Sequence, residues 1–209
     1  MVIPSPIRLG YTSLPFDHED WLFELKYDGF RALAVIENGQ CQFLSLNLNP
    51  LRGLDTLANA LVKELKVDRA ILDGELAVID QDGRSIFRSM MFERKQARYC
   101  AFDLLSVYRH DLAALPLLKR KERLRQILPQ RSAHLLYVDH VMETGKVLFD
   151  WACAWDLEGI VAKKANSRYE VRPNGKPSRD WLKIKNRAYS QKEGREELFD
   201  KKQKKALIT

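Results

Sequence analysis

The chain is best understood from one stretch near its N-terminus, Glu24-Leu25-Lys26-Tyr27-Asp28-Gly29-Phe30-Arg31. Residues 21–27 alternate between an aromatic and aliphatic set and a second set that contains Glu24 and Lys26, which is typical of a half-buried strand. Glu24 and Lys26 should therefore project together, away from the aromatic face. We expect Asp28-Gly29 to end the strand in a turn, where glycine can supply a positive φ and let a ligand approach the backbone closely.

Lys26 is a candidate nucleophile toward a nucleotide phosphate. A lysine attacks phosphorus only as the free amine, and burial or neighbouring cations favour that form. The hypothesis therefore requires a cationic, partly closed pocket around Lys26. The alternative is a surface strand that ends in a turn, and these eight residues alone do not decide between the two.

The composition describes an ordinary globular protein. The 209 residues are 45% hydrophobic and 30% charged, which suffices for one substantial core or two small lobes. The three cysteines are scattered and lack metal-ligand spacing, so we interpret them as reduced thiols in a cytosolic protein. No apolar run reaches the roughly 18 residues of a membrane span, and the N-terminus lacks a signal-peptide pattern. We therefore expect a cytoplasmic location and no membrane partner.

The formal net charge of +7 is unevenly distributed. Residues 163–209 contain 15 lysines and arginines against 6 acids, whereas residues 1–162 contain 20 against 22. A basic C-terminal part suggests a polyanionic partner such as nucleic acid. For residues 190–209, a solvated, frayed helix and a binding element both remain open.

Hydrophobic periodicity and turn residues predict an α+β fold with mainly antiparallel sheets and flanking helices. Asn38-Gly39 and Asp82-Gly83 predict the turns of two hairpins, over residues 32–45 and 70–87. The other predicted elements are helices over residues 54–66, 117–128 and 144–155, the last capped by Thr144, and strands over residues 99–107, 135–141, 159–165 and 181–186. We expect residues 1–189 to form one domain and residues 190–209 to form a charged tail.

Five clusters follow one another along the chain. They are Lys26-x-Asp28-Gly29-x-Arg31, Asp73-Gly74-Glu75, Phe102-Asp103-Leu104-Leu105, Glu158-Gly159-Ile160-Val161-x-Lys163 and Trp181-Leu182-Lys183-Ile184-Lys185. Their order and spacing over residues 21–185 resemble the adenylation domain of ATP-dependent DNA ligases, in particular the bacterial ligases associated with end joining. These enzymes are covalent nucleotidyltransferases, as are RNA ligases and mRNA capping enzymes. The resemblance implies an ATP-grasp-like nucleotidyltransferase fold and a place in the bacterial cytosol or nucleoid.

The resemblance also implies a reaction, in which Lys26 attacks the α-phosphate of ATP, expels pyrophosphate and forms a lysyl-AMP phosphoramidate. It places Glu24 beside the adenine and Arg31 near the ribose and phosphate. Glu75 would accept from the ribose hydroxyls, and Phe102 would stack on the purine. Simpler roles stay open, namely an ion pair between Glu24 and Lys26, an exposed strand acid at Glu75 and a core position for Phe102.

The other site residues implied by the resemblance are also charged. Glu158 matches the metal-associated glutamate, and its carboxylate suits Mg²⁺. Lys183 and Lys185 are two apart on a predicted strand, so both ammonium groups should share a face and stabilise phosphoryl charge. Lys163 is a weaker candidate for the same cationic wall, and Asp103 would support the site by hydrogen bonding. The alternatives are a strand-edge acid at Glu158 and an edge strand that its lysines keep soluble.

The chain departs from the family pattern in two places. The family usually carries Ser-Arg-Asn after the first hairpin, with an arginine that engages phosphate, whereas this chain reads Ser45-Leu46-Asn47, and Arg52 is a candidate substitute. Full ligases also continue into an OB-fold domain that closes over ATP and grips the duplex, and only 24 residues follow Lys185 here. We therefore expect slow self-adenylation. Sealing of nicked or broken DNA should fail, or should depend on a preformed AMP adduct or on a partner protein that clamps the DNA.

Two other functions stay open. One is nucleotidyl transfer of the RNA ligase or capping type. The other is a non-catalytic nucleic-acid-binding module, in which a degenerate ligase core holds DNA through its basic C-terminal part. Leu46 and the missing OB-fold domain favour the binding module, whereas the intact set of lysines and glutamates favours catalysis. A ligase that uses NAD⁺ would need an N-terminal nicotinamide-binding module, for which the 25 residues before Lys26 are too few.

Overall fold

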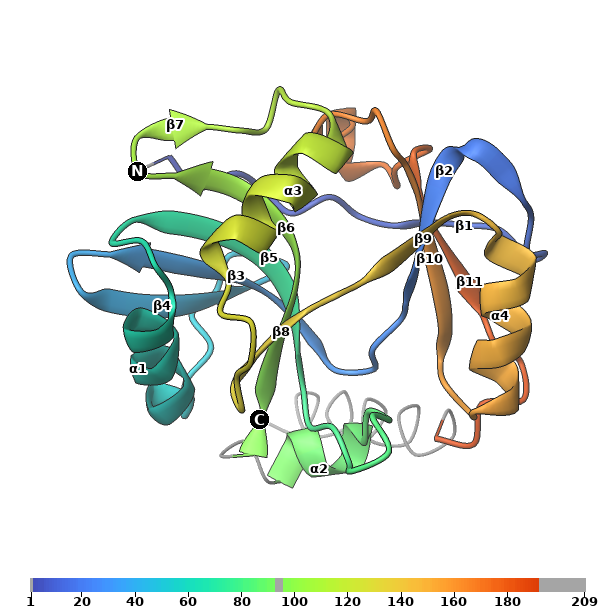
Figure 1. The fold of residues 1–209 in the computed structure, drawn as a ribbon, viewed down its shortest axis with the longest axis horizontal. Helices are drawn as coiled ribbons and strands as arrows, with labels where there is room; N and C mark the ends of the chain where they lie inside the picture. Colours follow the sequence, from blue (N-terminus) through green and yellow to red (C-terminus); the bar gives the residue numbers. More distant parts are fainter. Residues whose placement is uncertain (1, 93–95, 192–209) are drawn as a thin grey trace, which may run out of the picture.

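The computed structural model describes residues 2–92 and 96–191, which form two sheets with helices on their outer sides (Figure 1). Sheet A has the strand order β1-β11-β10-β2-β9. Its strands are β1 (Gly10–Tyr11), β2 (His18–Leu25), β9 (His140–Glu143), β10 (Gly159–Lys164) and β11 (Trp181–Lys185). Three of its four pairings are antiparallel, and β1 runs parallel to β11.

Sheet B has the strand order β4-β3-β5-β6-β7, and β8 pairs with β6. Its strands are β3 (Phe30–Glu37), β4 (Gln40–Ser45), β5 (Ala70–Ala77), β6 (Arg98–Val107), β7 (His110–Asp111) and β8 (Leu135–Tyr137). All pairings are antiparallel except that between β6 and β8. The predicted α+β class with mainly antiparallel sheets is confirmed.

The helices cover the sheets where their apolar faces can be buried. They are α1 (Asp55–Glu64), α2 (Phe87–Phe92), α3 (Leu117–Ile127) and α4 (Gly145–Ala154), and a short 3₁₀ turn spans Pro173–Gly175. Helix α1 packs on β4, α3 on β6 and α4 on β2, β9 and β10, so α1 and α4 flank opposite ends of the molecule (Figure 1). The three helices expected from the sequence are confirmed. Thr144 lies at the start of α4, but its hydroxyl donates to the Met142 carbonyl and makes no cap bond to the helix.

Strand β2 differs from the half-buried strand expected from its alternation. Leu22 and Phe23 are both completely buried. Phe23 packs with Ala152 of α4 on one face of sheet A, while Leu22 packs with Leu33 and Ile71 of sheet B on the other. Because β2 lies between β10 and β9 and is covered on both faces, alternation along this strand separates two cores rather than core from solvent.

One predicted hairpin is confirmed in full, and the other is confirmed at its turn but has only a short returning arm. Asn38 and Gly39, with φ of 53° and 73°, form the turn between β3 and β4. After β5 the chain turns at Asp82-Gly83, where Gly83 has a φ of +85° and Ile79 forms an antiparallel bridge with Ser85. Ile86 donates its N–H to the Val78 carbonyl, and helix α2 then begins at Phe87, so the returning arm is short. Strand β5 is already paired with β3 and β6 on its two edges, so the returning arm cannot extend along residues 70–77.

The single strand expected over residues 135–141 is also wrong, because the chain crosses between the sheets there (Figure 1). Strand β8 pairs with β6 of sheet B, and β9 pairs with β2 of sheet A. Val138, between them, donates its N–H to the Ala101 carbonyl. In the described part of the chain, no helix is long and apolar enough to cross a bilayer. Most of the expected charged tail, residues 192–209, lies outside the described residues.

Candidate active site

A narrow cavity lies where the two sheets face each other and collects side chains from both. Sheet A contributes Glu24, Leu25, Val161, Lys163 and Trp181, sheet B contributes Arg31, Glu75 and Phe102, and Leu9, Lys26, Tyr27 and Val138 complete the wall. Six of the nine site residues expected from the sequence are thus brought together: Glu24, Lys26, Arg31, Glu75, Phe102 and Lys163. The cavity measures about 50 Å³, enough for a few water molecules, so a purine would require side chains to move.

Lys26 follows directly after β2 and pairs with Glu158, which directly precedes β10. Its Nζ lies 2.5 Å from Oε2 of Glu158, and the Lys26 N–H donates to the Gly159 carbonyl. Oε1 of the same carboxylate lies 3.8 Å from Nζ of Lys185 on β11. The sequence predicts cations around Lys26, whereas the structure places a carboxylate between Lys26 and Lys185.

Glu24 is completely buried between two ammonium groups. Oε1 accepts from Nζ of Lys121 on α3, and Oε2 lies 2.5 Å from Nζ of Lys163 on β10. Burial alone would raise the pKa of Glu24, but the two lysines outweigh it and lower that pKa. Burial also lowers the pKa of Lys163, to about 8, despite the opposing effect of Glu24. The alternative pairing of Glu24 with Lys26 is not formed, because each has a different partner.

Phe102, on β6, is surrounded by cations. Nζ of Lys163 lies 4.0 Å from its ring centroid, and Cζ of Arg31 lies 5.2 Å from it. The same Lys163 nitrogen lies 4.1 Å from the ring of Trp181, which meets Phe102 edge-on. A purine that stacked on the ring face covered by Lys163 would have to displace this ammonium group.

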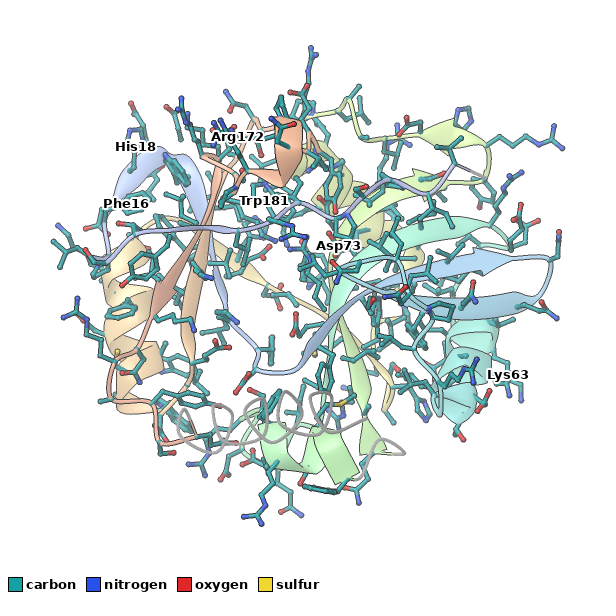
Figure 2. The ribbon with its side chains drawn as sticks, turned by 180° about the vertical axis from the view of Figure 1, so that it is seen from behind. Phe16, His18, Lys63, Asp73, Arg172 and Trp181 are labelled. Carbon is teal, nitrogen blue, oxygen red and sulfur yellow. The ribbon has the colours of Figure 1, made fainter. Side chains whose placement is uncertain are left out.

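Arg31 is held by a buried network rather than left free for a ligand. Its guanidinium donates to both carboxylate oxygens of Asp73, at 3.0 and 2.6 Å, and to the carbonyl of Ile7. The hydroxyl of Tyr169 also donates to Asp73. Asp73 lies between the two sheets near Trp181, as Figure 2 shows. The network ties β3, β5 and the N-terminal segment to the segment that follows β10.

Three of the expected positions lie apart from the main cavity. Glu158 and Lys185 line an adjoining pocket of about 330 Å³ with Asp28, Tyr189 and Arg187. Lys183 pairs through the backbone with Val161 but is not among the residues that line either pocket. The hydroxyl of Tyr189 donates to Asp28, which is completely buried, so the chain after β11 is attached beneath the Lys26 loop.

At two positions another backbone segment comes so close that only glycine fits. Gly29 does not have the positive φ that the sequence suggested. A Cβ there would lie 2.1 Å from the carbonyl oxygen of Leu76, so the position accepts no side chain. Gly159 combines both constraints, with φ of +134° and an equally close carbonyl of Ile184. These contacts fix the Lys26 loop against β5 and the Glu158 turn against β11.

Arg120 and Lys121 are functional candidates that the sequence interpretation missed. Arg120 is completely buried, donates to both oxygens of Asp103 and bonds the carbonyls of Leu115 and Ser167. Asp103, expected to support the site by hydrogen bonding, accepts these bonds, and burial raises its pKa although Arg120 opposes the rise. One signal could have found these residues. They lie three and four positions after Leu117, on the apolar face of an otherwise basic helix.

A magnesium ion would find few protein ligands here. Within the described ranges, no group of three or more His, Cys, Asp or Glu side chains could hold a metal. Mg²⁺ in nucleotide enzymes is commonly held by one or two carboxylates together with substrate phosphates. Glu158 beside Lys26 fits that arrangement, with the remaining ligands coming from nucleotide and water.

The buried acid and lysine pairs, the aromatic wall and the two facing sheets together define a nucleotide-binding α+β enzyme of the nucleotidyltransferase class. A match to the ATP-dependent DNA ligase domain family covers residues 12–185. The chain belongs to this family, whose members are ATP-dependent covalent nucleotidyltransferases. The resemblance inferred from the five clusters is confirmed.

Two relatives and one solved structure illustrate the similarity. The chain is 31% identical over 194 residues to the SPbeta prophage-derived DNA ligase-like protein LigB of Bacillus subtilis, with 90% of this chain and 69% of LigB covered. It is 34% identical to the multifunctional non-homologous end joining protein LigD of Pseudomonas aeruginosa, with 79% of this chain but only 20% of LigD covered. The fold matches mycobacterial DNA ligase D complexed with ATP and MES at a TM-score of 0.71 and 24% identity, over 87% of this chain and 60% of that one.

Proposed function

We propose that this chain transfers AMP from ATP through Lys26 to a 5′-phosphate at a DNA break. Nζ of Lys26 attacks the α-phosphorus, the bond to pyrophosphate breaks, and a lysyl phosphoramidate forms. The adenylyl group then passes to the 5′-phosphate, and the 3′-hydroxyl of the other strand end displaces AMP. The observation that carries the proposal is the pairing of Lys26 with Glu158 at the junction of two pockets that are lined by residues of the family's motifs.

The contacts of Lys26 support its role as nucleophile. An ammonium group must lose a proton before its nitrogen can attack, and the Glu158 carboxylate is in direct contact with it at 2.5 Å. Glu158 would also hold Mg²⁺, which would neutralise charge on the phosphates. The adjoining pocket, with Lys185 and Arg187, offers the cationic surface that a departing pyrophosphate needs.

The two pockets suggest how ATP would lie. Glu24, Phe102 and Lys163 form the end of the cavity suited to the base, and Glu75 offers a carboxylate for ribose hydroxyls. Arg31 would act mainly by fixing this wall through Asp73, since its hydrogen bonds are directed there. Lys183, on the same strand as Lys185, is proposed to meet phosphate only once a nucleotide is bound.

The proposal extends to the context in which the chain works. We assign residues 1–189 to the adenylation domain and residues 190–209 to a charged tail, and we place the protein in the cytoplasm. DNA that is nicked or broken is the proposed acceptor, in agreement with the non-homologous end joining proteins among the relatives. We also propose that a partner protein contributes to the grip on this DNA.

Incubation with α-labelled ATP and Mg²⁺ tests the first step. The wild-type chain and Lys146→Ala, an exposed lysine of α4, should become covalently labelled, whereas Lys26→Ala should not. Intact mass measurement should show one added adenylyl group. Absence of label on the wild-type chain would overturn the enzymatic proposal and favour a binding module. If the wild-type chain is labelled, assays of sealing on nicked DNA and on nicked RNA, each with ATP or GTP, would identify the acceptor.

A further inference from the structure

Lys121 lies outside all five family clusters, yet its ammonium group reaches the centre of the site. It comes from α3, and its side chain is only 1% exposed. Nζ lies 2.5 Å from Oε1 of Glu24, 97 residues earlier in the chain. The ring of Tyr137, with its centroid 4.7 Å away, covers the ammonium group from the side of β8.

The hydrogen bonds of Lys121 are fully used. Besides Glu24, its ammonium group donates to the carbonyls of Val138, at 3.0 Å, and Phe102, at 3.4 Å. An ammonium group has three donors, so all of them are engaged. Arg120, the preceding residue, anchors α3 to β6 through its buried pair with Asp103. Lys121 is therefore fixed in place and has no donor left for a ligand.

Lys163 holds the other oxygen of Glu24 in a different way. Its ammonium nitrogen is 2.5 Å from Oε2, and it lies 4.0 Å and 4.1 Å from the ring centroids of Phe102 and Trp181. Lys163 lines the cavity and is almost fully buried. Glu24 takes one of its three N–H groups, and no backbone carbonyl among the described residues accepts from the others, so these can donate to an acceptor atom of a ligand, unlike those of Lys121.

We propose that Lys121 is a positioning residue that fixes the Glu24 carboxylate at the base-binding end of the cavity, and thereby makes the site select adenine over guanine nucleotides. The inference rests on the proposed nucleotide site. It assigns the two lysines separate tasks, because Lys121 orients Glu24 while Lys163, besides its contact with Glu24, keeps N–H groups that can bond the base.

The donor and acceptor pattern of the two purines gives the reason for selection. Adenine presents the N6 amino donor beside the N7 acceptor, whereas guanine presents the O6 and N7 acceptors. A fixed carboxylate accepts from the adenine amino group, and the neighbouring ammonium group can donate to a ring nitrogen. Guanine would place O6 against the Glu24 oxygens, two acceptors with no proton between them. Without Lys121 the Glu24 carboxylate could rotate away from O6, and the repulsion that disfavours guanine would be relieved.

The experiment compares equilibrium affinities for ATP and GTP in a Lys26→Ala background, where no covalent adduct can form. Lys121→Met should lower the ratio of ATP to GTP affinity by at least about tenfold, the size of one good base-edge contact. Lys119→Met, on the same helix but exposed and paired with Glu122, should leave the ratio unchanged. A folded Lys121→Met protein with the original ratio would overturn the proposal, as would a parent protein that binds neither nucleotide.

A double variant separates positioning from direct contact. In a Glu24→Gln background, Lys121→Met should cause no further change in the ATP to GTP ratio, because Lys121 acts only through Glu24. A further fall of about tenfold there would overturn the proposal. The double variant loses one negative and one positive charge together and leaves neither unpaired, so it can be measured even if Lys121→Met alone does not fold. Covalent labelling of the chain that retains Lys26 reports separately on the proposed function.

Discussion

The ammonium nitrogen of Lys26 lies 2.5 Å from Oε2 of Glu158, a residue 132 positions later in the chain. The Glu158 backbone carbonyl accepts from the N–H of Asn186, which fixes this turn at the end of β11. The pair thus joins three segments of sheet A at one point. It provides the proposed nucleophile with a carboxylate that can take its proton.

Replacement of Glu158 by glutamine should slow self-adenylation strongly. The amide retains the size of the side chain but cannot accept a proton from Lys26, and loss of such a group costs on the order of 10²- to 10⁴-fold in rate. The measurement is the initial rate of covalent labelling by α-labelled ATP. Glu122→Gln, an exposed acid on α3, serves as the control. Labelling of Glu158→Gln at the wild-type rate would contradict the role assigned to this pair.

The buried pair of Asp103 and Arg120 should matter far more for stability than an exposed pair. Both side chains are completely buried, so Asp103→Asn should lower the free energy of unfolding by roughly 3–5 kcal/mol. Asp139→Asn breaks the exposed pair with Arg125 and should cost less than about 1 kcal/mol. Urea unfolding measures both.

A combined replacement tests the cause of that loss. Asp103→Leu together with Arg120→Met removes both buried charges and should be less destabilising than Asp103→Asn alone. If the double variant had the lower free energy of unfolding, the loss of stability would come from lost packing or lost carbonyl contacts rather than from an unpaired charge.

Lys163 should make stability depend on pH above neutrality. Burial lowers its folded-state pKa to about 8, whereas the unfolded chain keeps the ordinary value of 10.5. Between these values the unfolded state binds more protons, so the free energy of unfolding should rise with pH. Below pH 8 the full cost of the buried ammonium is present. Glu24 faces both Lys121 and Lys163, so when Lys163 loses its proton the Glu24 carboxylate and the Lys121 ammonium group remain as a pair of zero net charge.

Unfolding of wild type and Lys163→Met at pH 7 and pH 9.5 measures this effect. The free energy of unfolding of the wild-type protein should rise relative to that of the variant by about 2 kcal/mol, because about 1.5 pH units of this interval lie above the folded-state pKa. A difference between the two proteins that does not change with pH would show that Lys163 does not titrate in this range.

Gly29 and Gly39 should respond differently to substitution by alanine. At Gly29 a Cβ would lie 2.1 Å from a backbone oxygen, so the Lys26 loop must shift. We expect a loss at least as large as the roughly 1–3 kcal/mol of core overpacking, together with loss of labelling. At Gly39 no atom lies within 4 Å of the added Cβ, and only the φ of +73° opposes it. Gly39→Ala should cost roughly 1 kcal/mol and leave labelling intact.

Leu46 occupies the position where the family usually carries arginine, and its side chain is partly exposed. Leu46→Arg should strengthen binding to nicked DNA and steepen its salt dependence by about one phosphate contact, without changing self-adenylation. Leu14→Arg, at a more exposed site, controls for added charge alone. Equal gains in both variants would show that position 46 has no special relation to DNA.

The short-range features of this fold follow closely from the sequence. The turn at Asn38-Gly39, the helices α1 and α3 and the strands β6, β10 and β11 lie within a few residues of their expected bounds. Each is governed by periodicity or turn chemistry within one element. The differences are the short returning arm at residues 78–87 and the divided strand at residues 135–141. They arise where the availability of a strand edge or a crossing between sheets decides the conformation.

The sequence by itself determined the chemical inventory of the site, because motif order and strand periodicity place Lys26, Glu75, Phe102 and Glu158 at fixed points on local elements. Only the tertiary structure decided which charges meet. Glu24 pairs with Lys121 and Lys163, and Lys26 pairs with Glu158, through contacts between distant segments. Periodicity assigns a side chain to one face of its own strand or helix, but the partner on the facing element depends on how the two sheets and α3 pack together.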